Sequence, residues 1–280
     1  MSLLPVSSRA LVMGVLNVTP DSFSDAGRWL EPADAITRGI AMVSEGADVV
    51  DIGGESTRPG AAAVPPDEQL RRVIPVVEAL AEHVRVSIDT RSAKVAAAAV
   101  AAGATLINDV SACLGQVAAD HGVGWVAMHM LGDPLTMQDD PRYADVVSEV
   151  AAFLDARAAE AEAAGVSEVW IDPGIGFGKT LEHNLALLRG IGALVELGRP
   201  VLVGTSRKGL LGSLTARNGI VPPPEDRVEA SVASAVWAVL RGARMVRVHD
   251  VAPTVNAIRL MEAPAAEDFE PPLTVEEAVA

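Results

Sequence analysis

The residues of this sequence best suited to chemistry are polar side chains at the ends of short apolar runs. The runs are mostly β-branched, as expected of parallel strands buried on both faces. If such strands close into a ring, their carboxyl ends meet at one rim, where catalytic residues lie whatever the reaction. The polar residues at or just beyond the run ends are Asn17, Glu55 to Arg58, Asp89, Asn108, His129, Asp172, Ser206 to Lys208, Arg247 and His249. Any one of them could cap a helix, but the whole set exceeds what capping requires.

Two carboxylates and a carboxamide in this set suit the edge of a flat heterocycle. Asp89 and Asp172 can accept hydrogen bonds from ring N–H groups, and Asn108 offers both a donor and an acceptor. The combination matches a 2-amino-4-oxo ring system such as a pterin. The alternative for Asp89 is capping of the helix predicted to begin at RSAKVAAA. Capping also stays open for Asp172, although Pro173 and Gly174 follow it directly.

A cationic pair on the last run indicates an anion site. Arg247 and His249 are two residues apart, so on a strand both face the same side, while Val248 faces the other. Two cations near the usual phosphate region of a barrel are typical of phosphate binding. Asn17, on the adjacent first run, could share the anion or hold a divalent metal that bridges to it. The alternative is that Arg247 pairs only with Asp250.

Two segments imitate well-known motifs without meeting them. GIGFGKT (174–180) has three residues between Gly174 and Gly178, whereas a P-loop needs four, so no phosphate cradle is predicted. GTSRKG (204–209) lacks a glycine two residues after Ser206, so Ser206 is not expected to be a nucleophile. The loops 19–27 and 55–60 flank the same rim and suit segments that close over reactants, with ordinary surface loops as the alternative.

Eight strand-then-helix units position these residues. The apolar runs span 11–17, 48–53, 85–89, 105–110, 124–129, 168–174, 201–206 and 245–250. Amphipathic stretches predict helices at 34–45, 67–82, 92–102, 143–164, 181–197 and 227–240, several ending at a glycine suited to a C-cap, as in EGAD, AAGA, AAGV and RGAR. A doubly wound open sheet usually has a glycine-rich loop after its first strand, where this chain has NVTPDSFSD. The sequence therefore favours an α/β fold, a single (β/α)8 TIM barrel with parallel strands and helices outside.

Composition limits the partners and surroundings of the chain. A formal charge of −15 and 3% aromatic residues argue against nucleic-acid binding. The single cysteine, Cys113, forms no internal disulfide, which favours a reducing cytoplasm. The first apolar run is predicted to be a strand rather than a signal peptide, and no membrane span is expected. We expect a catalytic domain at 1–262 and an acidic, disordered tail at 263–280.

The series of strand-end motifs resembles the dihydropteroate synthase family. The motifs are, in order, NVTPDSFSD, GGESTRPG, SIDT, IND, MHM, DPGIGFGK, SRK and RVHD, and the match runs from about Met13 to about Ala257. The resemblance implies a cytoplasmic transferase of folate biosynthesis that condenses 6-hydroxymethyl-7,8-dihydropterin pyrophosphate with para-aminobenzoate. It also implies Mg²⁺ as cofactor, a homodimer, and sulfonamide drugs competing at the para-aminobenzoate site.

The resemblance implies roles for individual residues as well. The pterin would be bound by Asp89, Asn108, Met128, Asp172, Phe177, Gly204 and Lys208. Pyrophosphate would be bound by Asn17, Thr57, Arg58, Arg247 and His249, with Asn17 also contacting the metal. Para-aminobenzoate would be bound by Phe23, Thr57, Pro59, Ser206 and Gly209. The residues implied for catalysis are Asp25, Arg58 and Lys208, with Asp25 on the side where the pterin methylene becomes cationic.

Two positions depart from the family pattern. The first loop commonly reads DGG in the family, whereas this chain has Asp25, Ala26 and Gly27, which restricts a backbone position that needs positive φ. Many members carry a hydroxyl after SRK, whereas Gly209 offers only its N–H at a predicted helix N-terminus. We expect any differences in loop closure and aminobenzoate affinity to arise here.

Two other functions stay open on the residues alone. Pterin-dependent methyltransferase barrels share the pterin pocket but use a corrinoid partner and no pyrophosphate, so they would not need Arg247 with His249 or the ESTRPG loop. A non-catalytic pterin-binding homologue is the second alternative, and the intact Asp25, Arg58 and Lys208 count against it.

Overall fold

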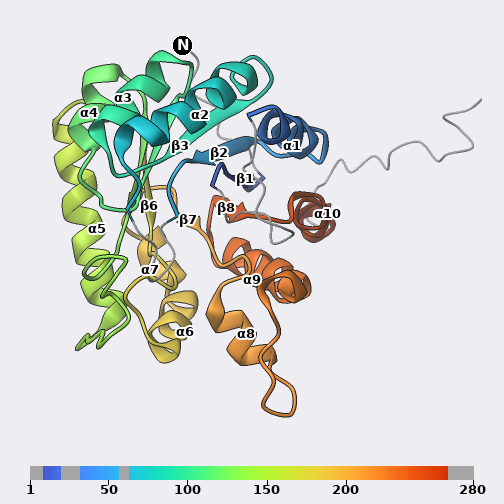
Figure 1. Cartoon of the computed structure of the whole chain (residues 1–280). Helices are drawn as coiled ribbons and strands as arrows, with labels where there is room; N and C mark the ends of the chain where they lie inside the picture. Colours follow the sequence, from blue (N-terminus) through green and yellow to red (C-terminus); the bar gives the residue numbers. More distant parts are fainter. Residues whose placement is uncertain (1–8, 20–31, 57–62, 264–280) are drawn as a thin grey trace, which may run out of the picture.

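Eight parallel strands form the centre of the computed structural model, which describes residues 9–19, 32–56 and 63–263 (Figure 1). They are β1 (Leu11–Asn17), β2 (Val49–Gly53), β3 (Arg85–Asp89), β4 (Leu106–Asp109), β5 (Gly124–Met128), β6 (Val169–Asp172), β7 (Leu202–Val203) and β8 (Met245–Val248). Their hydrogen-bonded order is β6-β5-β4-β3-β2-β1-β8-β7, and a parallel bridge between Ile171 and Val201 joins the two edges. The predicted barrel is therefore confirmed, closed by a thin seam between β6 and β7, and the open-sheet alternative is wrong.

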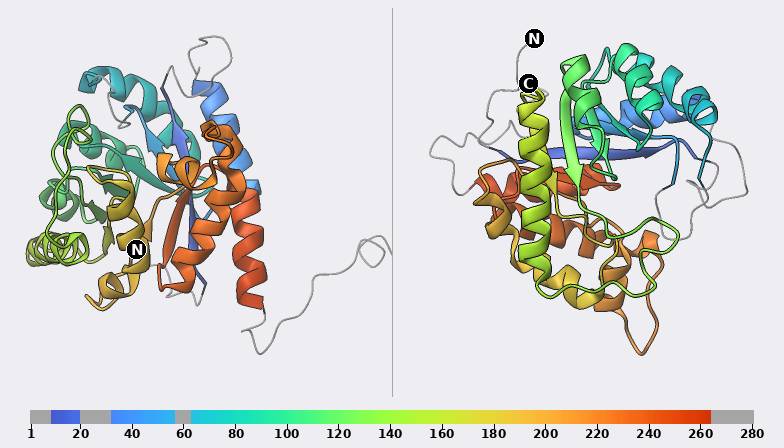
Figure 2. Two further views of the ribbon diagram at one scale, coloured as in Figure 1. Left: turned by 90° about the horizontal axis from the view of Figure 1, so that it is seen from below. Right: turned by 90° about the vertical axis from the view of Figure 1, so that its left-hand side faces the viewer.

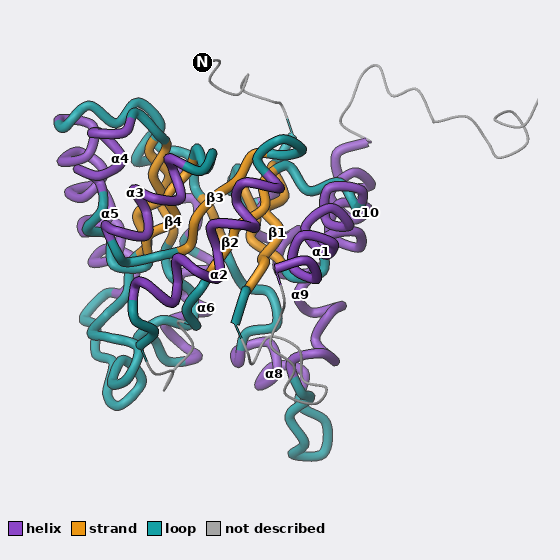
Figure 3. Tube along the Cα trace, turned by 45° about the horizontal axis from the view of Figure 1, so that its top comes forward, coloured by secondary structure: helices purple, strands orange, loops and turns teal. Residues whose placement is uncertain are grey.

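Helices surround this barrel in chain order (Figures 1 and 3). They are α1 (Pro32–Ser44), α2 (Pro66–Leu80), α3 (Ala93–Ala101), α4 (Gly115–His121), α5 (Val146–Ala163), α6 (Leu181–Arg189), α7 (Ile191–Val195), α8 (Gly209–Thr215), α9 (Val228–Leu240) and α10 (Val251–Glu262), with a 3-10 turn at Pro224–Arg227. Each helix from α1 to α6 packs on the next, and α9 packs on α10. Figure 2 shows α10 beside α1, so the helical layer also covers β1.

The predicted helices are confirmed, with one break. The stretch 181–197 ends as α6 at Arg189 and resumes as α7 at Ile191. The intervening Gly190 presses on α5, because a Cβ there would lie 2.9 Å from Val147 Cγ1. The four predicted C-cap glycines, at 46, 103, 165 and 242, all have positive φ. The sequence did not predict α4 or α10, and it gave α8 only as a helix start.

Two apolar cores lie on the two sides of the barrel wall. The larger lies between strands and helices and includes Ile52, Ile88 and Ile171. The smaller fills the inside of the barrel and consists of Met13, Val49, Leu106, Val126, Trp170, Leu202 and Met245. Because side chains alternate along a strand, the smaller core identifies the residues two and four positions further on as inward-facing too. In the described part of the chain no helix is long and apolar enough to cross a membrane.

Candidate active site

Inward-facing residues change from apolar to polar along several of the strands. On β6, Trp170 belongs to the inner core and Asp172 comes two residues later. On β4, Leu106 is followed in the same way by Asn108, and on β8 Met245 is followed by Arg247. One end of the barrel is thus packed with hydrocarbon and the other is polar. The polar rim was predicted from the sequence for two reasons. Side chains alternate along each strand, and all strands run in the same direction, so their last inward-facing residues meet at one end of the barrel.

A row of paired residues crosses four strands at this rim. Asn17 pairs with Gly53, Gly53 with Asp89, and Asp89 with Asn108. A Cβ at Gly53 would lie 3.5 Å from Asn17 Oδ1 and 3.7 Å from Asp89 Oδ2, so the absence of a side chain leaves these two oxygens facing a shared space. On the next pair of strands Met128 is paired with Asp172. The structure therefore brings together the strand residues predicted for the pterin and the one predicted for the metal.

Arg247 connects this row of residues to Asp51, which lies two positions before Gly53 on β2. Its Nη2 donates to Asp89 Oδ2 and its Nε donates to Asp51 Oδ2, both at 2.6 Å. Burial works against the charge of Arg247, but the two carboxylates outweigh it and raise the pKa of the guanidinium. The alternative in which Arg247 pairs with Asp250 is wrong, because Asp250 binds Arg207 instead. Arg247 thus lies in the barrel interior, as the alternation along β8 predicted.

Asp51 is a site residue that the sequence reasoning missed. Its side chain is completely buried, and besides Arg247 it accepts a hydrogen bond of 2.9 Å from Asn108 Nδ2. That bond directs the amide nitrogen of Asn108 toward β2 and leaves its oxygen as the end that can meet a ligand. The available signal was an acid in the middle of the apolar run VVDIG, at an inward position two residues before Gly53.

Three buried oxygens around Asp51 have no hydrogen-bond partner among the described residues. They are Asp51 Oδ1, Ser87 Oγ and Asp89 Oδ1, and Ser87 is the cross-strand partner of Asp51. Buried polar atoms are nearly always satisfied, so acceptors held in this way are suited to N–H groups that a ligand brings. Burial raises the pKa of Asp89 to about 7, against the opposing charge of Arg247. Asp89 does not cap the following helix, because Ser92 fills that position.

Asp172 and Lys208 form a second charged pair at the rim. Asp172 accepts a hydrogen bond of 2.7 Å from Gly174 N, and burial raises its pKa while the charge of Lys208 lowers it. Lys208 Nζ donates to the carbonyl of Ile175 and lies 4.6 Å from the centre of the Phe177 ring. Burial lowers the pKa of Lys208 to about 8. A Cβ at Gly204 would lie 3.9 Å from Lys208 Nζ and 3.6 Å from Arg247 Cβ, so Gly204 lies beside both residues, and its contact with the pterin stays a prediction.

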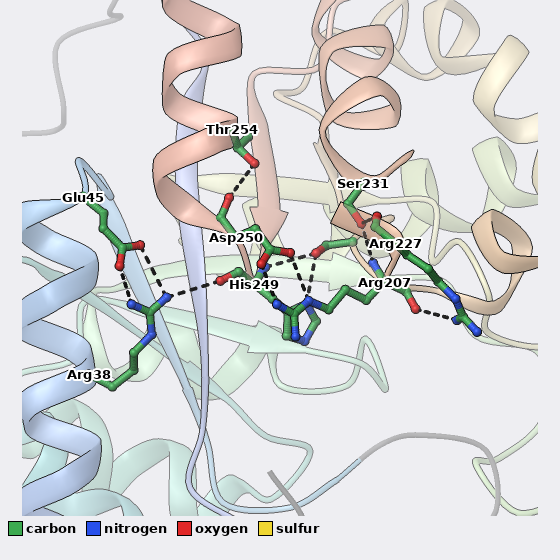
Figure 4. Close-up of polar contacts among 9 residues, drawn as sticks. Arg38, Glu45, Arg207, Arg227, Ser231, His249, Asp250 and Thr254 are labelled. Carbon is green, nitrogen blue, oxygen red and sulfur yellow. Dashed lines mark hydrogen bonds and ion pairs between the residues drawn. The ribbon is translucent and has the colours of Figure 1, made fainter. Parts of the chain in front are cut away.

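A tight turn after β7 sets the positions of Ser206 and Lys208. Arg207 has φ of 60°, its N–H donates to Ser231 Oγ at 2.9 Å, and its carbonyl accepts from Arg227 Nη1 at 2.9 Å (Figure 4). The ion pair with Asp250 holds its side chain. A non-glycine residue in this conformation persists only where its surroundings fix it. The run 201–206 is therefore shorter as a strand than predicted, because the chain turns away to form this site.

His249 lies against the same turn. Ser206 Oγ is 3.1 Å from both the backbone nitrogen and Nδ1 of His249. Arg38 Nη2 donates to the carbonyl of His249 at 3.4 Å, so α1 also fixes this end of β8 (Figure 4). Gly209 is the first residue of α8, which confirms the predicted helix start. Ser206 and Gly209 lie in the turn as expected, and their contact with para-aminobenzoate stays a prediction.

Most of the two polar loops, 20–27 and 57–60, falls outside the described residues. The residues concerned are Phe23, Asp25, Ala26, Thr57, Arg58 and Pro59. Their assigned roles in catalysis, pyrophosphate binding and aminobenzoate binding therefore stay predictions. The tail predicted at 263–280 lies almost wholly outside the described residues as well, while α10 ends at Glu262.

Comparison with known proteins gives a consistent result. A family model described as "Pterin binding enzyme" matches residues 13–249. The dihydropteroate synthase of Mycobacterium leprae (strain TN) is 48% identical over 273 residues, covering 94% of this chain and 95% of its own length. That of Escherichia coli (strain K12) is 44% identical over 260 residues and covers 90% of each chain.

Solved structures agree with the sequence comparison. Xanthomonas albilineans dihydropteroate synthase with 4-aminobenzoic acid superimposes with a TM-score of 0.86 at 49% identity, covering 93% of this chain and 95% of its own. The same enzyme in complex with 7,8-dihydropteroate gives a TM-score of 0.83 at 45% identity, covering 95% of this chain and 97% of its own. The likeness therefore includes every strand that carries a rim residue.

Proposed function

Because the chain belongs to the dihydropteroate synthases within the pterin binding enzyme family, we propose how its rim divides the reaction among three subsites. The reaction joins 6-hydroxymethyl-7,8-dihydropterin pyrophosphate to para-aminobenzoate and gives 7,8-dihydropteroate and pyrophosphate. The main support for this assignment of subsites is that five residues converge at one end of the barrel, namely Asp89, Asn108, Asp172, Lys208 and Arg247. The relatives are dihydropteroate synthases, which sets the corrinoid methyltransferase aside.

The pterin subsite lies deepest in the rim. Asp172 and Asp89 accept hydrogen bonds from the amino and ring N–H groups of the pterin, and the oxygen of Asn108 accepts another. Support comes from the bond between Asn108 Nδ2 and Asp51, which turns that oxygen away from β2, and from the unpartnered Asp89 Oδ1. Met128 and Phe177 supply apolar contact for the faces of the ring, and Lys208 binds its carbonyl edge.

The pyrophosphate subsite lies beside it, on β8 and β1. Arg247 and His249 provide positive charge and hydrogen-bond donors, with Thr57 and Arg58 completing the site from the loop. Asn17 offers a carboxamide oxygen, the hard type of ligand that Mg²⁺ takes, and Mg²⁺ commonly uses one or two protein ligands with phosphate and water as the rest. The described residues contain no cluster of three or more His, Cys, Asp or Glu that could hold a metal by itself. This fits an ion that arrives with pyrophosphate, where it would neutralise negative charge on the leaving group.

The para-aminobenzoate subsite is assigned to the turn after β7 and the two loops, with Ser206, Gly209, Phe23, Thr57 and Pro59. Relatives support it, since Yersinia pestis dihydropteroate synthase has been solved with a sulfonamide drug and the Xanthomonas albilineans enzyme with 4-aminobenzoic acid. We propose the same subsite as the target of sulfonamides in this chain. We also propose a homodimer that works in the cytoplasm, where a single free cysteine is stable.

The chemistry requires charges of both signs close together. The amine of para-aminobenzoate attacks the pterin methylene, a C–N bond forms, the C–O bond to pyrophosphate breaks, and the nitrogen loses a proton. Arg247 and His249 stabilise the departing anion, and Asp25 is the carboxylate that we assign to the methylene as it becomes cationic. Asp89 and Asp172 hold the ring so that the methylene stays in line with both groups. No side chain needs to form a covalent bond.

Pyrophosphate release should require both substrates and the metal together. With purified protein, dihydropterin pyrophosphate, Mg²⁺ and para-aminobenzoate, we expect stoichiometric pyrophosphate and dihydropteroate. Chelating the metal should slow release by at least about tenfold, because charge on the leaving group is no longer neutralised. A coupled phosphate assay and chromatography of the product measure both. Absence of release with all three present would contradict the proposal.

Lys208→Ala should weaken binding of dihydropterin pyrophosphate by about tenfold or more, the effect of losing one charged hydrogen bond. Because the pKa of Lys208 is about 8, its ammonium is present below that pH and lost above it. Wild-type affinity should therefore fall as pH rises through about 8, and the variant should lack this fall. Calorimetry across that range measures both, with the exposed Lys94→Ala as control. Unchanged affinity in Lys208→Ala would remove Lys208 from the pterin site.

A further inference from the structure

The chain uses lysine at only three positions, against nineteen arginines. Lys94 is exposed and pairs with Asp67, whereas Lys179 and Lys208 both donate to the loop 173–180 between β6 and α6. An ammonium is a compact point charge that fits among converging carbonyl groups, whereas a guanidinium is planar and larger. In a chain that otherwise selects arginine, two lysines that donate to the same loop indicate a geometric requirement.

Carbonyl groups form a cage around the Lys179 ammonium. Only 3% of Lys179 is exposed, and its Nζ lies 2.9 Å from the Phe177 oxygen, 3.0 Å from the Gly174 oxygen and 3.3 Å from the His129 oxygen. His129 Nδ1 is the fourth acceptor, at 3.0 Å. None of these partners is a carboxylate, so Lys179 is not held as part of an ion pair. It ties the end of β5 to two points of the loop.

The glycines of the same motif make this approach sterically feasible. Gly174 has φ of 65°, and a Cβ there would lie 1.9 Å from the His129 oxygen. Gly178 has φ of 62°, and a Cβ there would lie 2.5 Å from the Leu131 oxygen. The loop therefore lies directly on the backbone beyond β5 and turns carbonyl groups inward. The segment GIGFGKT does not have the spacing of a P-loop, and its carbonyl groups instead surround the ammonium of its own Lys179.

The other side of this loop forms the wall of the pterin pocket. The carbonyl of Ile175 accepts from Lys208 Nζ, and the Phe177 ring lies under the same ammonium at 4.6 Å. Gly174 N donates to Asp172 Oδ1. The contacts that set Asp172 and Lys208 thus come from the residues 174–177, whose backbone Lys179 holds.

We propose that Lys179 is a positioning residue for the pterin pocket, which fixes the loop 173–178 and through it aims the Lys208 ammonium at the pterin beside Asp172. The proposal rests on the pterin-binding role proposed above for Lys208. Lys179 itself does not touch substrate. The charged or titratable groups around it are Lys208, Asp172 and His129.

The three lysines make a direct measurement available. In protein labelled with ¹³C at the lysine side chains, each ammonium gives one signal whose pH titration can be followed by NMR. Lys179→Met releases the backbone that presents the Ile175 carbonyl and the Phe177 ring to the Lys208 ammonium, so the pKa of Lys208 should fall by roughly half a unit or more. Lys208→Met removes a like charge that lowers the pKa of Lys179, so the pKa of Lys179 should rise, and Lys94→Met should move neither. If Lys179→Met fails to fold, the Lys208→Met titration still decides. Constant pKa values in both variants would overturn the proposal.

Kinetics separates positioning from a general loss of structure. Lys179→Met should raise KM for dihydropterin pyrophosphate about tenfold, while kcat and KM for para-aminobenzoate stay within about twofold. Lys179→Arg should behave like Lys179→Met, because the cage does not fit a guanidinium. Unchanged pterin binding in Lys208→Ala would remove the role on which the proposal rests. Impaired Lys208→Ala with unimpaired Lys179→Met would overturn the proposal about Lys179 alone.

Discussion

Arg247→Met is expected to lower kcat/KM by about a thousandfold and to destabilise the fold by about 3–5 kcal/mol. The activity falls because a preorganised cation at the leaving group is lost, an effect of about 10²–10³ for one such group. The stability falls because Asp51 and Asp89, both bonded to Arg247 at 2.6 Å, are left as buried carboxylates without a cation.

The pH dependence of this loss has a defined sign. The pKa of Asp89 is already raised to about 7 in the presence of Arg247, and removing the guanidinium raises it further. A carboxyl whose pKa is higher in the folded than in the unfolded state favours folding when protonated, and this contribution is lost as pH rises through the folded-state pKa. Arg247→Met should therefore be most stable near pH 5 and should melt at a lower temperature at each step toward pH 8.

A second substitution separates the two effects. Adding Asp51→Asn to Arg247→Met removes one of the stranded carboxylates, so the double variant should regain part of the stability but none of the activity. Arg241→Met is the matched control, because Arg241 stacks on Trp237 at 4.7 Å on the outside of the barrel. Thermal unfolding and steady-state kinetics measure both quantities. An Arg247→Met enzyme that keeps its melting temperature and a tenth of its kcat/KM would refute the assignment.

Much of the site could be predicted from the sequence because a parallel barrel leaves few choices. A run end indicates where most of the strands stop, and the two-residue period predicts which side chains point inward. Asp172 and Arg247 were placed by these two rules alone, and the structure puts them at the same rim. The ligands were predicted from the family resemblance, because the spacing of residues along the strands does not identify a ligand.

The partners of the charged residues could not be predicted in the same way. Arg247 bonds to Asp51, which is 196 residues earlier, and to Asp89, which is 158 residues earlier. Such pairings depend on strand register and on the stagger of a closed barrel, and the only ion-pair partner that the local sequence offered was the alternative, Asp250, three residues away. The break at Gly190 was missed for a similar reason, since it depends on contact with Val147 on another helix.

Asp172→Asn is expected to have the second largest effect, a fall in kcat/KM of about a hundredfold or more without loss of stability. Asparagine keeps the shape and an oxygen for Gly174 N, but it presents an NH₂ group where the pterin also donates, and an unpaired buried donor is costly. Because burial raises the pKa of Asp172 in the folded state, its carboxylate opposes folding at neutral pH. The neutral amide should therefore leave the melting temperature unchanged or higher.

The sign of that stability change distinguishes a ligand-binding group from a structural one. A carboxylate that also holds the fold would lose stability together with activity, as Arg247 is predicted to do because it also binds the buried Asp51 and Asp89, whereas Asp172 should lose activity alone. Asp172 raises the pKa of Lys208, so the lysine signal should also titrate at lower pH in the variant. Asp120→Asn, on the exposed face of α4, controls for the loss of one acidic group. If Asp172→Asn retained wild-type kcat/KM, the pterin would have to be held by the β3 and β4 residues without β6, and the division of the rim proposed here would be wrong.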